Sequence, residues 1–304
     1  MSMPFYVSPE QQMRDKSDYA RKGVGRSRSS VVLQYDGGIL MATPNASTVL
    51  HKISEIYDRI AFAAVGRYNE YEVLRKAGVT YADLTGYSFD RGDVTARGLA
   101  NWYAQQLGTS FTESMKPYEV EIVVAEVGAR PDDDQIYRIS WDGSVSDEPG
   151  FVAFGGQADQ VSAALKEAFS DNMSLTEALG AALAALTAPP AATPAASGTS
   201  ASAASTAGNG TPTELTAAQL EIAILDRARA HRTFRRLQGP RLEELIAASR
   251  SASASAPAAD AAPAPGAAPA PGAAAAPEAA PASDDPPTGP TAGSDGIPKP
   301  PKSK

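Results

Sequence analysis

Hydrophobic residues along this chain occur either as short apolar runs or at helix-like spacing, and the two patterns predict different elements. Runs bounded by Gly, Asp or Pro predict β-strands, whereas apolar residues that recur every three to four positions predict helices. The predicted strands are 31–33, 39–41, 60–65, 118–127 and 135–141. The predicted helices are 69–77 with Gly78 as an interruption, 91–107, 155–169, and 175–186 capped by Asn172 or Ser174. Asp36-Gly37 between the first two strands predicts a β-hairpin.

The N-terminal segment 8–22 predicts a helix that is polar nearly all round. Ser8 at the N-cap, Pro9 at N1 and Gln11 at N3 form a capping-box signature, and Gly23 is a candidate C-cap. A helix with so little apolar surface should not dock deeply on its own core. Two interpretations stay open, a frayed terminal helix and a helix stabilised by neighbouring subunits.

A further hairpin and helix are predicted near the end of the folded region. Residues 220–225 alternate as a half-buried strand does, 233–237 predict its partner, and 241–249 predict a short amphipathic helix. A lone hairpin is only marginally stable in water, so this one should complete a sheet begun earlier in the chain. The order of elements then predicts two sheets covered by helices, an α+β fold.

Two low-complexity segments divide the chain. Between 188 and 213, and from 250 to 304, Ile297 is the only apolar residue larger than Ala or Pro. Such segments bury too little apolar area to offset the entropy of ordering them. We therefore predict a single domain at 8–249 that is interrupted by the 188–213 insertion. An Ala/Pro-rich tail follows at 250–304, for which the sequence indicates no role.

Composition excludes several classes of protein. The 304 residues include no Cys and two His, which excludes a disulfide framework, zinc fingers and a thiol nucleophile and disfavours a His-based metal site. We expect no metal and no cofactor. The N-terminus lacks the apolar core of a signal peptide and no stretch approaches membrane-spanning length, so a cytoplasmic protein without membrane contact is predicted. The net charge of −8 argues against non-specific binding to nucleic acid.

Several short motifs follow one another in an order typical of one known family. They are SPEQQMRDKSDYARKG at 8–23, LHKISEIYDR at 50–59, FAAVG at 62–66, KPYEVE at 116–121, YRI at 137–139, DGS at 142–144, LDR at 225–227 and FRR at 234–236. Together they cover nearly all of 4–187 and 214–247. The ordered set resembles the α-type subunits of the proteasome core particle, in their actinobacterial branch. The low-complexity segments lie outside this resemblance.

The resemblance implies a four-layer αββα sandwich of the N-terminal-nucleophile hydrolase type. It implies a heptameric ring with other α subunits, stacked on rings of catalytic β subunits, which gates substrate passage. Further implied partners are a hexameric proteasome-activating ATPase, ATP-independent activators and protein substrates, in actinobacteria those tagged with the small modifier Pup. No nucleic-acid partner is implied.

The residues do not match a catalytic member of that family. Catalytic subunits use an N-terminal Thr whose own amine is the base, and they place an Asp and then a Lys beyond the first strand. Here the predicted helix 8–22 precedes the strand that begins near Ser29-Ser30, and Ala42-Thr43-Pro44-Asn45 contains no acid. No lysine lies between Ser30 and Lys52. We expect a non-catalytic subunit. The alternative is an autonomous N-terminal Ser/Thr hydrolase activated by processing near Ser29/Ser30.

The resemblance points to an activator-binding pocket. The His-Lys-Ile motif places Lys52 where α subunits use a lysine to pair with the C-terminal carboxylate of an activator tail. A carboxylate that enters a partly desolvated cleft needs a fixed positive charge. Gly66 matches a glycine of the same pocket, where a tail backbone can approach closely, although a turn glycine is the plainer interpretation.

The N-terminal arm 1–7 is the candidate gate. It contains Met3, Pro4, Phe5, Tyr6 and Val7. Copies of this arm from each subunit of a ring could meet on the axis and close it. A disordered terminus is the alternative. The segment Tyr57-Asp58-Arg59 is interpreted as a structural strand-edge pairing.

A basic cluster near the end of the domain is the best argument for nucleic-acid binding. Its members are Arg227, Arg229, His231, Arg232, Arg235 and Arg236. Because they lie along a predicted hairpin, a solvated sheet face explains them equally well. The acidic run 132–134 is interpreted as a loop, not a metal site.

Overall fold

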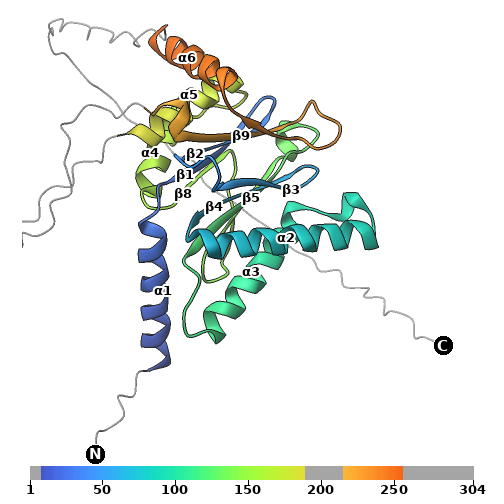
Figure 1. The fold of residues 1–304 in the computed structure, drawn as a ribbon, viewed down its shortest axis with the longest axis vertical. Helices are drawn as coiled ribbons and strands as arrows, with labels where there is room; N and C mark the ends of the chain where they lie inside the picture. The colour runs from blue at the N-terminus through green and yellow to red at the C-terminus, as the bar shows by residue number, and fades with distance from the viewer. Residues whose placement is uncertain (1–7, 189–214, 256–304) are drawn as a thin grey trace, which may run out of the picture. The chain divides into compact units, whose positions relative to one another are not determined.

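The computed structural model describes residues 8–188 and 215–255 (Figure 1). The helices are α1 (Pro9–Gly25), α2 (Tyr68–Ser88), α3 (Ala96–Glu113), α4 (Ala158–Ala168), α5 (Leu175–Thr187) and α6 (Pro240–Ser255). The strands are β1 (Ser30–Tyr35), β2 (Gly38–Pro44), β3 (Ile53–Tyr57), β4 (Ile60–Gly66), β5 (Val120–Glu126), β6 (Gln135–Ile139), β7 (Val145–Asp147), β8 (Phe151–Phe154), β9 (Leu220–Asp226) and β10 (Phe234–Leu237). Short 3₁₀ turns are η1 (Arg91–Asp93), η2 (Pro131–Asp133) and η3 (Ala217–Gln219).

The strands form two antiparallel sheets that face each other. The first sheet has the order β10-β9-β2-β1-β8 and the second has the order β3-β4-β5-β6-β7. Helices α4, α5 and α6 lie over the outer face of the first sheet, and α2 and α3 cover the second (Figure 1). This arrangement confirms the predicted four-layer αββα sandwich.

Apolar side chains fill all three spaces between the layers. On β1, Val31 and Leu33 belong to the cluster beneath α4, α5 and α6, whereas Val32 belongs to the cluster between the sheets. Phe62 on β4 packs on Tyr103 of α3 in the third cluster. Since side chains alternate along a strand, a strand buried on both faces is an unbroken apolar run. The runs seen in the sequence therefore have a structural cause.

Both predicted hairpins form. The β1–β2 pairing closes at Tyr35 opposite Gly38, so the chain turns at Asp36-Gly37. Strand β9 pairs with β10 on one side and with β2 on the other, where Ala223 lies opposite Met41. The prediction that the last hairpin completes an earlier sheet is confirmed.

Several element boundaries differ from the sequence prediction. Helix α2 continues through Gly78. The glycine allows close contact with α3, since a Cβ there would lie 1.8 Å from the Tyr103 hydroxyl. Helix α3 begins after η1, where Thr95 accepts a bond from the backbone N–H of Gly98. The pattern also missed β3, β7 and β8. Helix α6 extends beyond its predicted end at 249 to Ser255.

Helix α1 is mostly exposed, as its sequence predicts. The Ser8 hydroxyl accepts a hydrogen bond from the Gln11 N–H at 3.2 Å, but the Gln11 side chain donates to Asp15 instead of completing the capping box. The helix continues past Gly23 to Gly25 and buries only Ala20 and Val24. Its packing against neighbouring subunits stays a prediction. Among the helices of the described residues, none is long and apolar enough to cross a membrane.

Candidate functional site

Lys52 and Gly66 lie at the same end of the β3–β4 hairpin. Lys52 directly precedes β3, and its carbonyl accepts a hydrogen bond from the Ala64 N–H at 3.0 Å. Gly66 is the last residue of β4, two positions further on. The structure therefore brings together the two residues that the resemblance assigns to one pocket.

The Lys52 side chain is partly buried and its ammonium group has a neutral neighbour. Its Nζ atom lies 3.5 Å from the carbonyl oxygen of Pro44. Within the described part of the chain, no carboxylate forms an ion pair with it. Burial lowers the pKa of Lys52; the charge of Glu221 opposes this shift and that of Arg28 adds to it. The site thus holds a partly desolvated ammonium for which the described residues supply no ion-pair partner.

A buried carboxylate fixes the backbone that carries Lys52. Glu221 of β9 accepts hydrogen bonds from the backbone N–H groups of Lys52 (2.9 Å) and Ile53 (3.2 Å) and from the side-chain amide of Asn45 (2.8 Å). Arg236 of β10 also donates to it, and His51 Nδ1 lies 3.3 Å from Oε1. Only 5% of the Glu221 side chain is exposed. The sequence pattern shows Glu221 only as part of a predicted strand and does not indicate this role.

A cleft of about 380 Å³ with mixed polar and apolar lining opens beside this carboxylate. Asn45, His51, Glu221 and Arg236 line it together with Leu242 of α6. Lys52 is not among the residues that line this cleft.

Gly66 occupies a backbone position that other residues rarely adopt. Its φ angle is +109°, and a Cβ would lie 2.0 Å from the carbonyl oxygen of Glu119. The same carbonyl accepts a hydrogen bond from the Arg67 N–H at 3.1 Å. The glycine is therefore required by the close approach of β4 to the start of β5, whatever else it contacts.

Replacing Gly66 with alanine should destabilise the fold. We expect Gly66→Ala to lower the free energy of unfolding by about 1–3 kcal/mol, because alanine is strained at this φ angle and its Cβ meets backbone. Urea denaturation of the isolated chain measures the change. Gly25→Ala is the matched control, since no atom lies within 4 Å of the added Cβ and the residue ends a helix. Equal midpoints for the two variants would contradict the steric argument.

An ion-pair cluster lies next to Gly66 and was also missed by sequence analysis. Glu70 of α2 accepts from the Glu119 N–H at 2.7 Å and from Lys116 Nζ at 2.5 Å. The Glu119 carboxylate pairs with Arg67 at 3.0 Å and with Lys116 at 3.2 Å. Burial raises the pKa of Glu119, but hydrogen bonds from Lys116 and Tyr19 and the positive charges of Arg67 and Lys116 together lower it below its usual value. The cluster joins α1, α2 and β5 at the Gly66 end of the sheet.

Comparisons with known proteins agree with the motifs. Residues 24–192 match the family described as Proteasome subunit. A protein of Streptosporangium roseum named Proteasome subunit alpha is 61% identical over 256 residues, which are 84% of this chain and 91% of that protein. Proteins of the same name from Thermomonospora curvata and Kineococcus radiotolerans are each 60% identical; the matches cover 81% and 82% of this chain and 99% and 100% of theirs.

The chain belongs to the proteasome subunit family. Its resemblance to the actinobacterial α-type subunits is confirmed.

The start of β1 in this proteasome subunit does not resemble a nucleophile site. The Ser30 hydroxyl donates to Thr43 Oγ1 at 2.8 Å, and the Ser29 hydroxyl accepts from the Gln157 N–H at 2.9 Å. Both serines are buried. Upstream, the Ser27 N–H donates a hydrogen bond to the Val24 carbonyl, and the Ser27 carbonyl accepts one from the Gly156 N–H. These bonds fix the segment between α1 and β1. The subunit is a non-catalytic component of the proteasome, as its α-type relatives indicate.

The basic cluster is largely neutralised within the subunit. Its ion pairs are Arg227–Asp134, Arg232–Glu55, Arg235–Asp226 and Arg236–Glu221. These arginines hold strands and loops together, so the sheet interpretation accounts for them without nucleic acid.

The segment Tyr57-Asp58-Arg59 joins the sheets. The Asp58 carboxylate pairs with Arg91 at 2.7 Å, and its carbonyl accepts from the Thr233 N–H at 2.8 Å. Arg59 donates to the carbonyl of Val127 at 2.7 Å. These contacts support the structural interpretation of the segment.

Other sequence predictions fall outside what the structure describes. The candidate gate residues Met3–Val7, the insertion from 189 to 213 and the tail from 256 onward belong to this group. Among the described residues, no cluster of three or more acidic or His side chains could hold a metal ion.

Proposed function

We propose that this subunit forms the outer heptameric rings of a bacterial proteasome core, where it docks activators and gates the passage of substrates. It assembles with its own copies and with catalytic β subunits. Its activator is a ring-shaped hexameric ATPase, with ATP-independent activators as further partners, and its substrates are proteins tagged with Pup. The identity of its relatives supports the assembly, because each is named as a proteasome subunit alpha.

Lys52 carries the docking part of this proposal. Its ammonium is partly desolvated and contacts a neutral carbonyl oxygen, so an incoming carboxylate would gain a charge-assisted bond in a site partly shielded from water. The gain is largest for a C-terminal carboxylate, because a chain end can enter between two subunits where a side chain cannot reach. The test compares activator-stimulated degradation by wild-type and Lys52→Ala particles.

Removing the N-terminal arm should open the particle. We expect deletion of residues 2–7 to raise unstimulated peptide cleavage by the assembled core, because Phe5 and Tyr6 would no longer cross the axis. A fluorogenic peptide measures the rate without activator. Deletion of residues 258–304 is the control and should leave this rate unchanged. An unchanged rate after removal of the arm would contradict its role as the gate.

The competing function is an autonomous Ser/Thr hydrolase formed by cleavage before Ser29 or Ser30. The burial of both serines and their hydrogen bonds to Gln157 and Thr43 oppose it. It requires that peptidase activity persist when the β-subunit nucleophile is mutated.

A further inference from the structure

We propose that Glu221 is a positioning residue of the activator pocket. It sets the affinity for the C-terminal tail of an activator by fixing the backbone of Lys52. This inference rests on the proposed docking function of Lys52. Glu221 lies on β9, beyond the low-complexity insertion, and touches no expected ligand itself.

Glu221 holds both ends of the connection between the two sheets. The connection leaves β2 at Pro44 and enters β3 at Ile53. Its first residue, Asn45, donates to Glu221 Oε2 from the side chain, and Lys52 donates to the same oxygen from the backbone. The two donors are brought to one atom although seven positions separate them in the chain. The loop is thereby closed across a single carboxylate oxygen.

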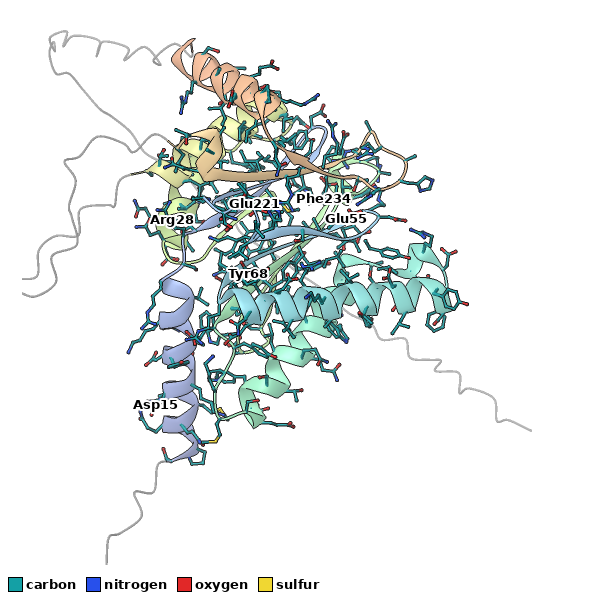
Figure 2. The ribbon with its side chains drawn as sticks, in the orientation of Figure 1. Asp15, Arg28, Glu55, Tyr68, Glu221 and Phe234 are labelled. Atoms are coloured by element: carbon teal, nitrogen blue, oxygen red, sulfur yellow. The ribbon has the colours of Figure 1, made fainter. Side chains whose placement is uncertain are left out.

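The opposite oxygen is fixed by groups of the second sheet and of β10. Oε1 accepts from the Ile53 N–H and from the Arg236 guanidinium, which also donates to the Ile53 carbonyl at 2.8 Å. The start of β3 is thus bonded at both its N–H and its C=O to a buried acid–arginine pair. Glu221 lies between the sheets and is buried (Figure 2).

This arrangement places Lys52 through its backbone, while the Lys52 ammonium contacts only the neutral carbonyl oxygen of Pro44 among the described residues. The Glu221 oxygens are occupied by backbone N–H groups, Asn45 and Arg236, and the Lys52 contact with Glu221 is made by its backbone N–H. A carboxylate that only neutralised Lys52 would compete with an activator tail, whereas this one orients the backbone. Charge-assisted bonds depend steeply on distance and angle, so a shift of the backbone would weaken the tail contact.

The test measures tail affinity in assembled core particles that contain the β partner. The probe is a peptide with the last residues of the activator ATPase and a free C-terminal carboxylate; its C-terminal amide is the blank. Glu221→Gln should weaken binding roughly tenfold, because the amide NH₂ faces N–H donors and at least one bond is lost.

A double variant separates positioning from general damage. In the Lys52→Ala background, Glu221→Gln should cause no further loss of affinity, since it acts through Lys52. Asp134→Asn is the matched control, because it also alters a buried carboxylate–arginine pair, with Arg227, but away from Lys52. An equal loss in both backgrounds, or the same loss in the control, would overturn the proposal. Full tail affinity in Lys52→Ala alone would instead overturn the docking function itself.

A milder variant covers the case in which Glu221→Gln does not assemble. Asn45→Ala removes one donor from the loop and leaves the Glu221–Arg236 pair intact. We expect it to weaken tail binding roughly threefold, again only when Lys52 is present. Unchanged affinity in this variant would contradict a positioning role for the carboxylate.

Discussion

Core particles that carry Lys52→Ala are expected to assemble normally but to lose activator-stimulated degradation. A charge-assisted bond in a partly desolvated site contributes about 1.5–3 kcal/mol, so tail affinity should fall roughly 10- to 150-fold. Because an ATPase ring engages through several tails at once, the loss multiplies across the interface and stimulation should disappear. Degradation of a folded, tagged protein with ATP and activator measures it.

Two comparisons make this result specific. Lys166→Ala removes an exposed lysine of α4 and should retain full stimulation. Basal cleavage of a short peptide should be the same in all particles, since Lys52 takes no part in the chemistry. Retained stimulation in Lys52→Ala would remove the basis of the pocket assignment.

The same lysine predicts a dependence on pH. Burial lowers the pKa of Lys52, although the Glu221 charge opposes this. As the pH rises through that lowered pKa, the ammonium loses its proton and tail affinity should fall, while the tail carboxylate stays ionised throughout. The fall should therefore begin at a lower pH than the titration of an exposed lysine. A titration of tail-peptide affinity against pH measures it.

The sequence predicted most of the fold because its strands are buried on both faces. Runs such as 39–41 and 60–65 are unbroken apolar segments, and Asp36-Gly37 marks a tight turn. The hydrophobic pattern does not predict strand β7 because all three of its residues are exposed. It does not predict β3 because only two of the five residues of that strand are buried. Such strands are held by pairing with neighbours, which a hydrophobic pattern does not record.

The site could be predicted only in part, for a related reason. The motif around Lys52 is local and is visible as a string of residues, so the resemblance located it. The role of Glu221 could not be predicted because its partners Asn45 and Lys52 lie 176 and 169 positions away in the sequence. Gly78 was misinterpreted as a break for the same reason, since the Tyr103 side chain that requires a glycine there comes from another helix. The role of a residue whose partners are distant in the sequence becomes visible only in the folded structure.

The largest effect on stability is expected at the ion pair between Asp134 and Arg227. The Asp134 side chain is wholly buried, and both its oxygens accept from Arg227 at 2.8 Å. It also accepts from the Gly128 N–H, while Arg227 donates to the Gly128 carbonyl. One acid thus ties the end of β9 to the loop between β5 and β6.

Asp134→Ala should lower the free energy of unfolding by about 3–5 kcal/mol, because it leaves the buried Arg227 cation without a carboxylate to pair with. Chemical denaturation of the isolated chain gives the value. The adjacent exposed pair Arg130–Asp133 supplies the control, and Asp133→Ala should change stability little. Replacing both partners, as in Asp134→Leu with Arg227→Met, should cost less than Asp134→Ala alone. If the double variant were the less stable, the favourable attraction of the pair, and not the stranded charge, would account for the loss.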